Sequence, residues 1–184
     1  MGRPKQLVEV SGEPLLRKVV RTVIASPADH VIVVLGSNAG DCVGPIRDCG
    51  VDIVTNPFWT SGLASSIRIG VERAEAAGAK AVLLVLADQP CISSQLVCKF
   101  LNQDYSRLRL IVAARYAGVL GPPLLFGADW FPDLKALEGD QGGRKIVENA
   151  GDLVIPIDWP EGQIDIDTPE DLEKTLEMFA RDDV

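Results

Sequence analysis

Residues 81–90 read AVLLVLADQP, an apolar run that ends in a carboxylate and a proline. The run predicts a strand, and Pro90 stops the chain from continuing it. Asp88 therefore stands at the carboxyl end of a strand. In open parallel sheets, ligands bind beyond the carboxyl ends of the strands, so Asp88 is a candidate functional residue. Its carboxylate can either cap the helix expected from Ser93 or hold a metal ion at the edge of the sheet.

The rest of the chain alternates between apolar runs and stretches with helical periodicity. VIVVLG (31–36) is continuously apolar up to a glycine and predicts a strand buried on both faces. PLLRKVVRTVIA (14–25) repeats its apolar residues at helical spacing. Other strands are expected at 51–55, 108–115 and 153–158, an irregular turn and short strand at 116–127, and other helices at 63–77, 128–137 and 143–150. This alternation predicts one three-layer α/β/α domain over residues 1–184, with a mostly parallel sheet.

The composition argues against several classes of function. A net charge of -8 disfavours a nucleic-acid partner, since binding one needs a clustered basic face. No apolar run approaches the roughly 20 residues of a membrane helix, and no signal peptide is recognisable, so a cytoplasmic protein is expected. His30 is the single histidine, and the four cysteines form no CxxC unit. We therefore expect neither a catalytic triad, nor a zinc site, nor disulfides.

A second acidic cluster lies in IDIDTPEDL (164–172). Asp165 and Asp167 are two residues apart, so in an extended backbone their carboxylates project to the same side. Mg²⁺ takes few protein carboxylates and completes its octahedron with water and phosphate oxygens. This pattern favours Asp88 and Asp167 as metal ligands, with Asp165 as a helper. The alternative is that Asp167 only helps to cap a final helix starting at Thr168.

The segment MGRPKQ (1–6) supplies the complementary positive charge. A turn with Gly2 and Lys5 can approach phosphates closely, because glycine lets the backbone come near and the ammonium offsets the oxygen charge. The alternative is a lysine that is simply solvated. Despite the acidic composition, a few local cations and amides can hold a small anionic ligand.

Motifs along essentially the whole chain resemble the MobA-like nucleotidyltransferases, most closely the branch that includes molybdenum cofactor cytidylyltransferase. They occur in the family's order and approximate spacing. The motifs are MGRPKQL, SGEPLL, VVLGSNA, VTNPFWTSGLASSIRIG, LLVLADQP, GPPLLF, GDQGGRK and DIDTPEDL. The NPFW segment with its two serines, ADQP and DIDTPEDL are the most specific of them.

This resemblance implies a Rossmann-like enzyme that moves CMP from CTP to the terminal phosphate of molybdopterin cofactor and releases pyrophosphate. It also implies Mg²⁺ as cofactor and suggests a molybdenum hydroxylase as a partner. By position, Lys5 corresponds to the triphosphate-binding lysine, and Asp88 and Asp167 to the Mg²⁺ ligands. The other residues implied are Gly2, Gly62, Ser65 and Ser66 on the nucleotide side, and Asn56, Gly121, Asp140 and Arg144 on the acceptor side.

Several of these residues also have purely structural interpretations. Asn56 precedes a proline, and this dipeptide is common in turns. Ser65 and Ser66 can be first-turn helix residues without a ligand. Arg144 can be an ordinary solvated residue at a helix start.

Relatives in this family begin with a buried strand and a loop resembling LAAGxSxR, placed directly before the Met-Gly of this motif. Met1 takes the place of that internal methionine, so we expect a chain truncated at its N-terminus relative to the family, with the first strand of the sheet missing. The rival functions are a related nucleotidyltransferase using GTP or another acceptor, and a non-catalytic accessory protein that binds molybdenum cofactor.

Overall fold

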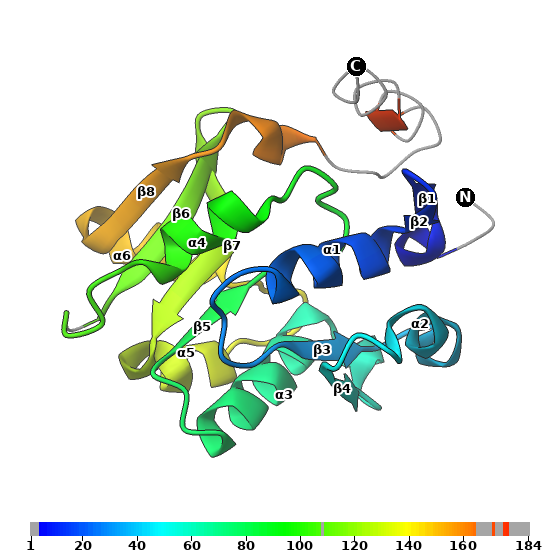
Figure 1. The fold of residues 1–184 in the computed structure, drawn as a ribbon. Coiled ribbons are helices and arrows are strands. Elements are labelled where there is room, and N and C mark those ends of the chain that lie inside the picture. The colour runs from blue at the N-terminus through cyan, green and yellow to red at the C-terminus, as the bar shows by residue number, and fades with distance from the viewer. Residues whose placement is uncertain (1–3, 108, 165–170, 172–174, 177–184) are drawn as a thin grey trace.

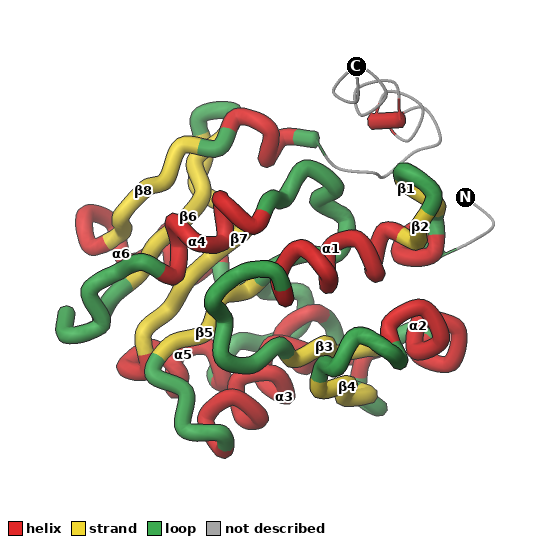
Figure 2. Tube along the Cα trace, in the orientation of Figure 1, coloured by secondary structure: helices red, strands yellow, loops and turns green. Residues whose placement is uncertain are grey.

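Helices cover both faces of the strands, as Figures 1 and 2 show. The computed structural model describes residues 4–107, 109–164, 171, 175 and 176. Helices α1 (Leu15–Ile24) and α4 (Ser94–Leu101) bury their apolar residues in one cluster with the sheet. Helices α3 (Leu63–Ala76), α5 (Phe131–Lys135) and α6 (Arg144–Ala150) do the same on the opposite face. The expected three-layer α/β/α architecture is confirmed.

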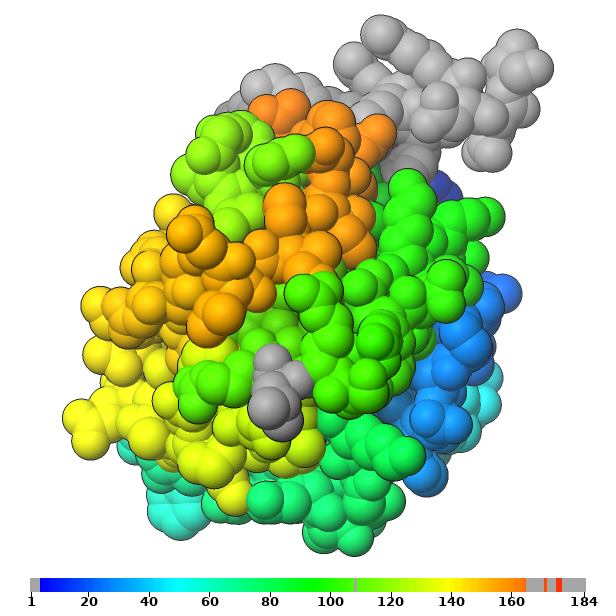
Figure 3. Space-filling view, turned by 90° about the vertical axis from the view of Figure 1, so that its left-hand side faces the viewer, coloured from blue at the N-terminus to red at the C-terminus, as the bar shows by residue number. Residues whose placement is uncertain are grey.

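The larger sheet has four strands in the order β5 (Ala81–Leu84), β7 (Val119–Gly127), β6 (Ile111–Tyr116), β8 (Val154–Asp158). It is a mixed sheet, because β7 runs antiparallel to both of its neighbours while β6 and β8 are parallel. Among the described strands, β8 lies at the edge of this sheet opposite β5. Its orange surface is visible beside that of α6 in Figure 3.

A two-residue turn makes β6 and β7 a hairpin. Ala117 and Gly118 join the paired residues Tyr116 and Val119, and both have positive φ, at 48° and 76°. Positive φ at both positions is typical of a type I′ turn, which matches the twist of antiparallel strands. The expected irregular turn is thus a tight hairpin turn. The pairing also shifts register after Ala113.

The smaller sheet pairs β3 (Ile32–Leu35) and β4 (Asp52–Thr55) in parallel. Helix α2 (Ala39–Ile46) connects the two strands and packs with α1 against β3. A short antiparallel pair, β1 (Glu9–Val10) and β2 (Glu13–Pro14), precedes α1. Within the part of the chain that the structure describes, no helix is long and apolar enough to cross a membrane.

The two sheets lie between the same helices. Helix α1 contributes Leu16 to a cluster with Leu35 of β3, and Leu15 to a cluster with Leu83 of β5. Helix α3 contacts β3, and its Ile67 lies in one cluster with Leu84 of β5. Strands β3 and β5 therefore belong to one layer.

No backbone ladder joins β3 to β5 among the described residues. Every residue of β5, and all of β3 except Leu35, is half-buried. The expected burial of VIVVLG on both faces is therefore wrong for all but Leu35, because within the described part of the chain β3 has a paired neighbour on one side only. Among the described residues, the ladder is therefore interrupted between these two strands of one layer.

We expect the amide hydrogens of β3 and β5 to exchange faster than those of β6 and β7. In the described structure the first two strands are paired on one side, and the latter two on both sides. Hydrogen–deuterium exchange on peptides covering 31–35, 81–85, 111–116 and 119–127 measures the difference. Equal protection of all four strands would contradict the interrupted sheet.

Candidate functional site

Lys5 and Asp88 meet at the carboxyl end of β5. Lys5 begins a short 3-10 helix (Lys5–Leu7), and Asp88 lies in the turn that follows the strand. Their Nζ and Oδ2 atoms are 2.6 Å apart, and their side chains are 34% and 23% exposed. The structure thus brings together two predicted site residues that are 83 positions apart in the chain.

The second carboxylate oxygen of Asp88, Oδ1, is buried and has no hydrogen-bond partner among the described residues. Leaving a buried acceptor unsatisfied is costly, so this oxygen is suited to a cation or a donor from a ligand. A divalent ion that keeps several water and phosphate ligands fits one such oxygen. Within the described ranges there is no group of three or more acidic, histidine or cysteine side chains that forms a complete metal site.

Three of the predicted site residues lie outside the described residues. They are Gly2, Asp165 and Asp167. The predicted final helix from Thr168 also falls largely in that part of the chain.

Asn56 organises the start of α3. It directly follows β4 and is completely buried. Its Nδ2 donates to the hydroxyls of Ser65 at 2.8 Å and Ser66 at 2.9 Å, while its Oδ1 accepts from the amide of Phe58. Both the NH2 group and the carbonyl oxygen of the Asn56 side chain are thus hydrogen-bonded. The side chain orients the two serines that the family resemblance assigns to the nucleotide side.

Gly62 lies against the segment around Gly139. Its φ is +95°, and a Cβ there would overlap the backbone carbonyl of Gly139 and come within 2.7 Å of Asp140 Oδ1. The amide of Ala64 donates to the carbonyl of Gly139 at 3.0 Å. The predicted segments around residues 62–66 and 139–144, distant in the sequence, therefore touch at the first turn of α3.

Gln89 is a residue that the sequence analysis did not single out. It is 1% exposed, its Nε2 donates to the carbonyl of Pro122 at 3.2 Å, and its buried Oε1 has no partner among the described residues. Gly121, next to Pro122, packs under the Tyr116 hydroxyl. Gln89 thus ties the turn that carries Asp88 to the strand that carries Gly121. In the sequence, its position between Asp88 and Pro90 is the feature that could have marked Gln89 as a candidate site residue.

Arg144 pairs with a residue of its own helix. Its Nε donates to Glu148 Oε1 at 3.1 Å, and both side chains are about half-exposed, at 54% and 55%. This half-exposed i, i+4 pair is compatible with both interpretations of Arg144, a solvated helix start and a side chain open to the acceptor.

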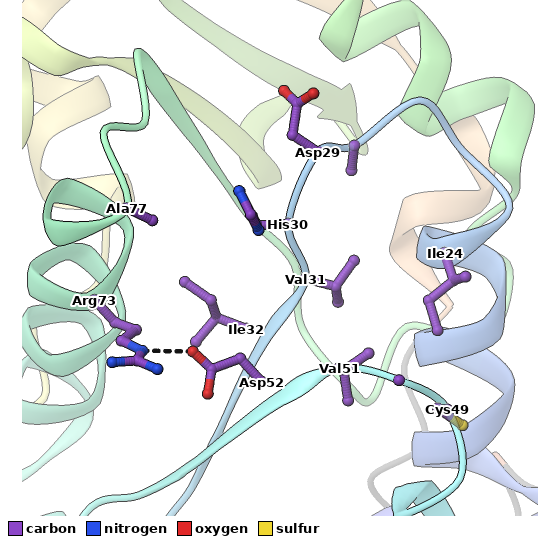
Figure 4. Close-up of a pocket in the computed structure, with 12 residues that line it drawn as sticks. Ile24, Asp29, His30, Val31, Ile32, Cys49, Val51, Asp52, Arg73 and Ala77 are labelled. Atoms are coloured by element: carbon purple, nitrogen blue, oxygen red, sulfur yellow. Dashed lines mark hydrogen bonds and ion pairs between the residues drawn. The ribbon is translucent and has the colours of Figure 1, made fainter.

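A separate cavity of about 310 Å³ lies at the amino ends of β3 and β4, away from the edge that carries Asp88. Figure 4 shows His30 and Asp29 on its wall, with Arg73 of α3 paired to Asp52 of β4. None of the predicted site residues that the structure describes lines it.

Comparisons with known proteins identify the family of the domain. The family model described as "MobA-like NTP transferase domain" matches residues 1–154. The purine catabolism protein PucB of Bacillus subtilis is 29% identical over 94% of this chain and 88% of its own. Molybdenum cofactor guanylyltransferase of Rhodobacter capsulatus is 26% identical over 98% and 90%.

A solved structure shares the fold. Rv0371C of Mycobacterium tuberculosis H37Rv, crystallised as a complex with manganese, superposes with a TM-score of 0.79 at 26% identity. The match covers 96% of this chain and 93% of that protein.

We expect Gly62→Ala to lower the free energy of unfolding by about 1–3 kcal/mol, because the new Cβ is strained at positive φ and overlaps Gly139. Gly40→Ala in α2 is the matched control, since a Cβ there meets nothing within 4 Å. Urea denaturation measures both variants. If Gly62→Ala is as stable as Gly40→Ala, the close approach of the two segments is wrong.

Proposed function

Since the chain belongs to the family of MobA-like NTP transferase domains, we propose that it transfers CMP from CTP to the terminal phosphate of molybdopterin cofactor in the cytoplasm, releasing pyrophosphate. The observation that carries the proposal is the meeting of Lys5 and Asp88 at the carboxyl end of β5, with one Asp88 oxygen left unpartnered among the described residues. The product's natural recipient would be a molybdenum hydroxylase.

Lys5 and Asp88 have complementary parts in this reaction. The ammonium of Lys5 offsets the charge of the triphosphate, exchanging its contact with Asp88 for phosphate oxygens as the nucleotide binds. Asp88, together with Asp167 and with Asp165 nearby, would hold Mg²⁺. A bound Mg²⁺ supplies positive charge to the phosphate oxygens as charge develops on them. The manganese in the crystals of Rv0371C supports a divalent ion in this fold.

The acceptor needs no general base. A phosphate monoester has a second pKa near 6, so at neutral pH its terminal oxygen is already anionic. That oxygen forms a bond to the α-phosphorus of CTP, and the bond from this phosphorus to the α,β-bridging oxygen breaks. The electron pair leaves with pyrophosphate. Catalysis then consists of in-line positioning and charge neutralisation, which suits a site without histidine.

The first turn of α3 separates the two substrates in this proposal. Ser65 and Ser66, oriented by Asn56, would face the nucleotide, with Gly62 close to its ribose and base. Gly121, Asp140 and Arg144 would line the acceptor side. The hydrogen bond from the amide of Ala64 to the carbonyl of Gly139 supports two adjoining subsites.

GTP is the second candidate nucleotide. The relative from Rhodobacter capsulatus is named a guanylyltransferase, and it aligns over 98% of this chain. CTP and GTP are therefore compared directly in the assay, with molybdopterin cofactor as acceptor.

We expect Asp88→Asn to lower the rate of pyrophosphate release by about 10²–10³-fold, the scale for losing one preorganised electrostatic group. Asp52→Asn is the matched control, since Asp52 is also a carboxylate paired with a cation but faces the opposite end of the strands. Pyrophosphate is measured with Mg²⁺, molybdopterin cofactor and either CTP or GTP.

The wild-type protein and Asp52→Asn should turn over at similar rates, and both should lose activity with a chelator. Transfer that persists in Asp88→Asn would overturn the assignment of this residue. Faster turnover with GTP than with CTP would support the proposed transfer reaction but identify GTP as the nucleotide substrate.

A further inference from the structure

Residues 136–143, here called the Gly139 loop, connect α5 to α6 on the acceptor side of the proposed site. Its middle, residues 138–141, is exposed, whereas Leu137 and Gly143 at its two ends are buried. Inside the loop, the amide of Gln141 donates to the carbonyl of Glu138, and the amide of Glu138 donates to the Gln141 side chain. These two hydrogen bonds close a turn within the exposed middle, and the contacts described next connect the loop to helix α3.

Arg68 of α3 contacts both the loop and the end of α5 that precedes it. Its Nε donates to the carbonyl of Lys135 at 2.9 Å, and its Nη2 donates to the carbonyl of Leu137 at 3.1 Å. Lys135 ends α5, so its carbonyl is one of those that a helix terminus leaves without an intrahelical partner. The planar guanidinium can serve both carbonyls at once, a geometry that a lysine ammonium does not reproduce.

The same helix makes one further contact with the loop and one with the end of α5. Ala64, one turn before Arg68, donates its amide to the carbonyl of Gly139 at 3.0 Å. Near the other end of α3, Glu75 pairs with Lys135 at 2.6 Å. Helix α3 thus carries both the serines of the nucleotide side and the anchors of the Gly139 loop.

We propose that Arg68 is a positioning residue that fixes the Gly139 loop, and with it Asp140, at the acceptor side of the site. The inference rests on the proposed function for its kinetic consequence. Arg68 itself touches backbone carbonyls outside the site, so it acts through the loop. Its loss should weaken acceptor binding and leave nucleotide binding nearly unchanged, because Ser65 and Ser66 are held by Asn56.

The test compares Arg68→Gln, Arg68→Lys and the control Arg73→Gln. Arg73 lies on the same helix but pairs with Asp52 at the other end of the strands, away from the loop. Hydrogen–deuterium exchange of the peptide covering 136–143 reports on the loop without requiring activity. Steady-state kinetics then gives KM for molybdopterin cofactor, KM for the nucleotide and kcat.

In Arg68→Gln we expect exchange of this peptide and KM for the acceptor each to rise about tenfold, the scale of one lost charged hydrogen bond. KM for the nucleotide should stay within about twofold of the wild-type value. In Arg68→Lys, both values should lie between those of the wild type and Arg68→Gln. The lysine keeps the positive charge but cannot donate to both carbonyls in the same geometry.

Equal exchange of this peptide in Arg68→Gln and Arg73→Gln would overturn the positioning role, whatever the activity. A rise in exchange with no transfer activity even in the wild type would keep the role of Arg68 and reject the proposed function. If Arg68→Gln does not fold, Arg68→Lys against Arg73→Gln decides the same question.

Discussion

The contact between Lys5 and Asp88 is the interaction on which the account depends. The strand β5 delivers Asp88 to the carboxyl edge of the sheet, and the segment before α1 delivers Lys5 to the same place. Opposite charges 2.6 Å apart at a partly exposed edge form an ion pair that an anionic ligand can open, because solvent and phosphate compete for the ammonium. The other oxygen of Asp88 is buried and lacks a hydrogen-bond partner among the described residues, so a cation would stabilise it.

Helix α3 links this edge to the rest of the site. Its first turn receives Asn56 from β4 and Gly139 from the loop after α5, so two segments that are far apart in sequence are held by one rigid element. Sites supported in this way are more precisely placed than sites on free loops. The arrangement also explains why a glycine stands at position 62, where no side chain fits beside Gly139.

Local patterns in the sequence predicted much of this structure. The apolar periodicity of residues 14–25 gave α1, and AVLLVLADQP placed Asp88 correctly at a strand end. The antiparallel course of β7 was missed, because it depends on Ala117 adopting positive φ, which alanine rarely signals. Arg68 and Gln89 were missed because their partners are distant backbone carbonyls, and such contacts leave no spacing pattern.

Binding of Mn²⁺ is the most direct test of the central claim. Electron paramagnetic resonance can follow the free ion as it is titrated with the full chain and a non-hydrolysable CTP analogue. The account predicts that the wild type and Asp52→Asn bind Mn²⁺ alike, and that Asp88→Asn binds it at least about tenfold more weakly, a loss of ~1.4 kcal/mol. Equal affinity in all three proteins would show that Asp88 holds no metal ion and would contradict the account.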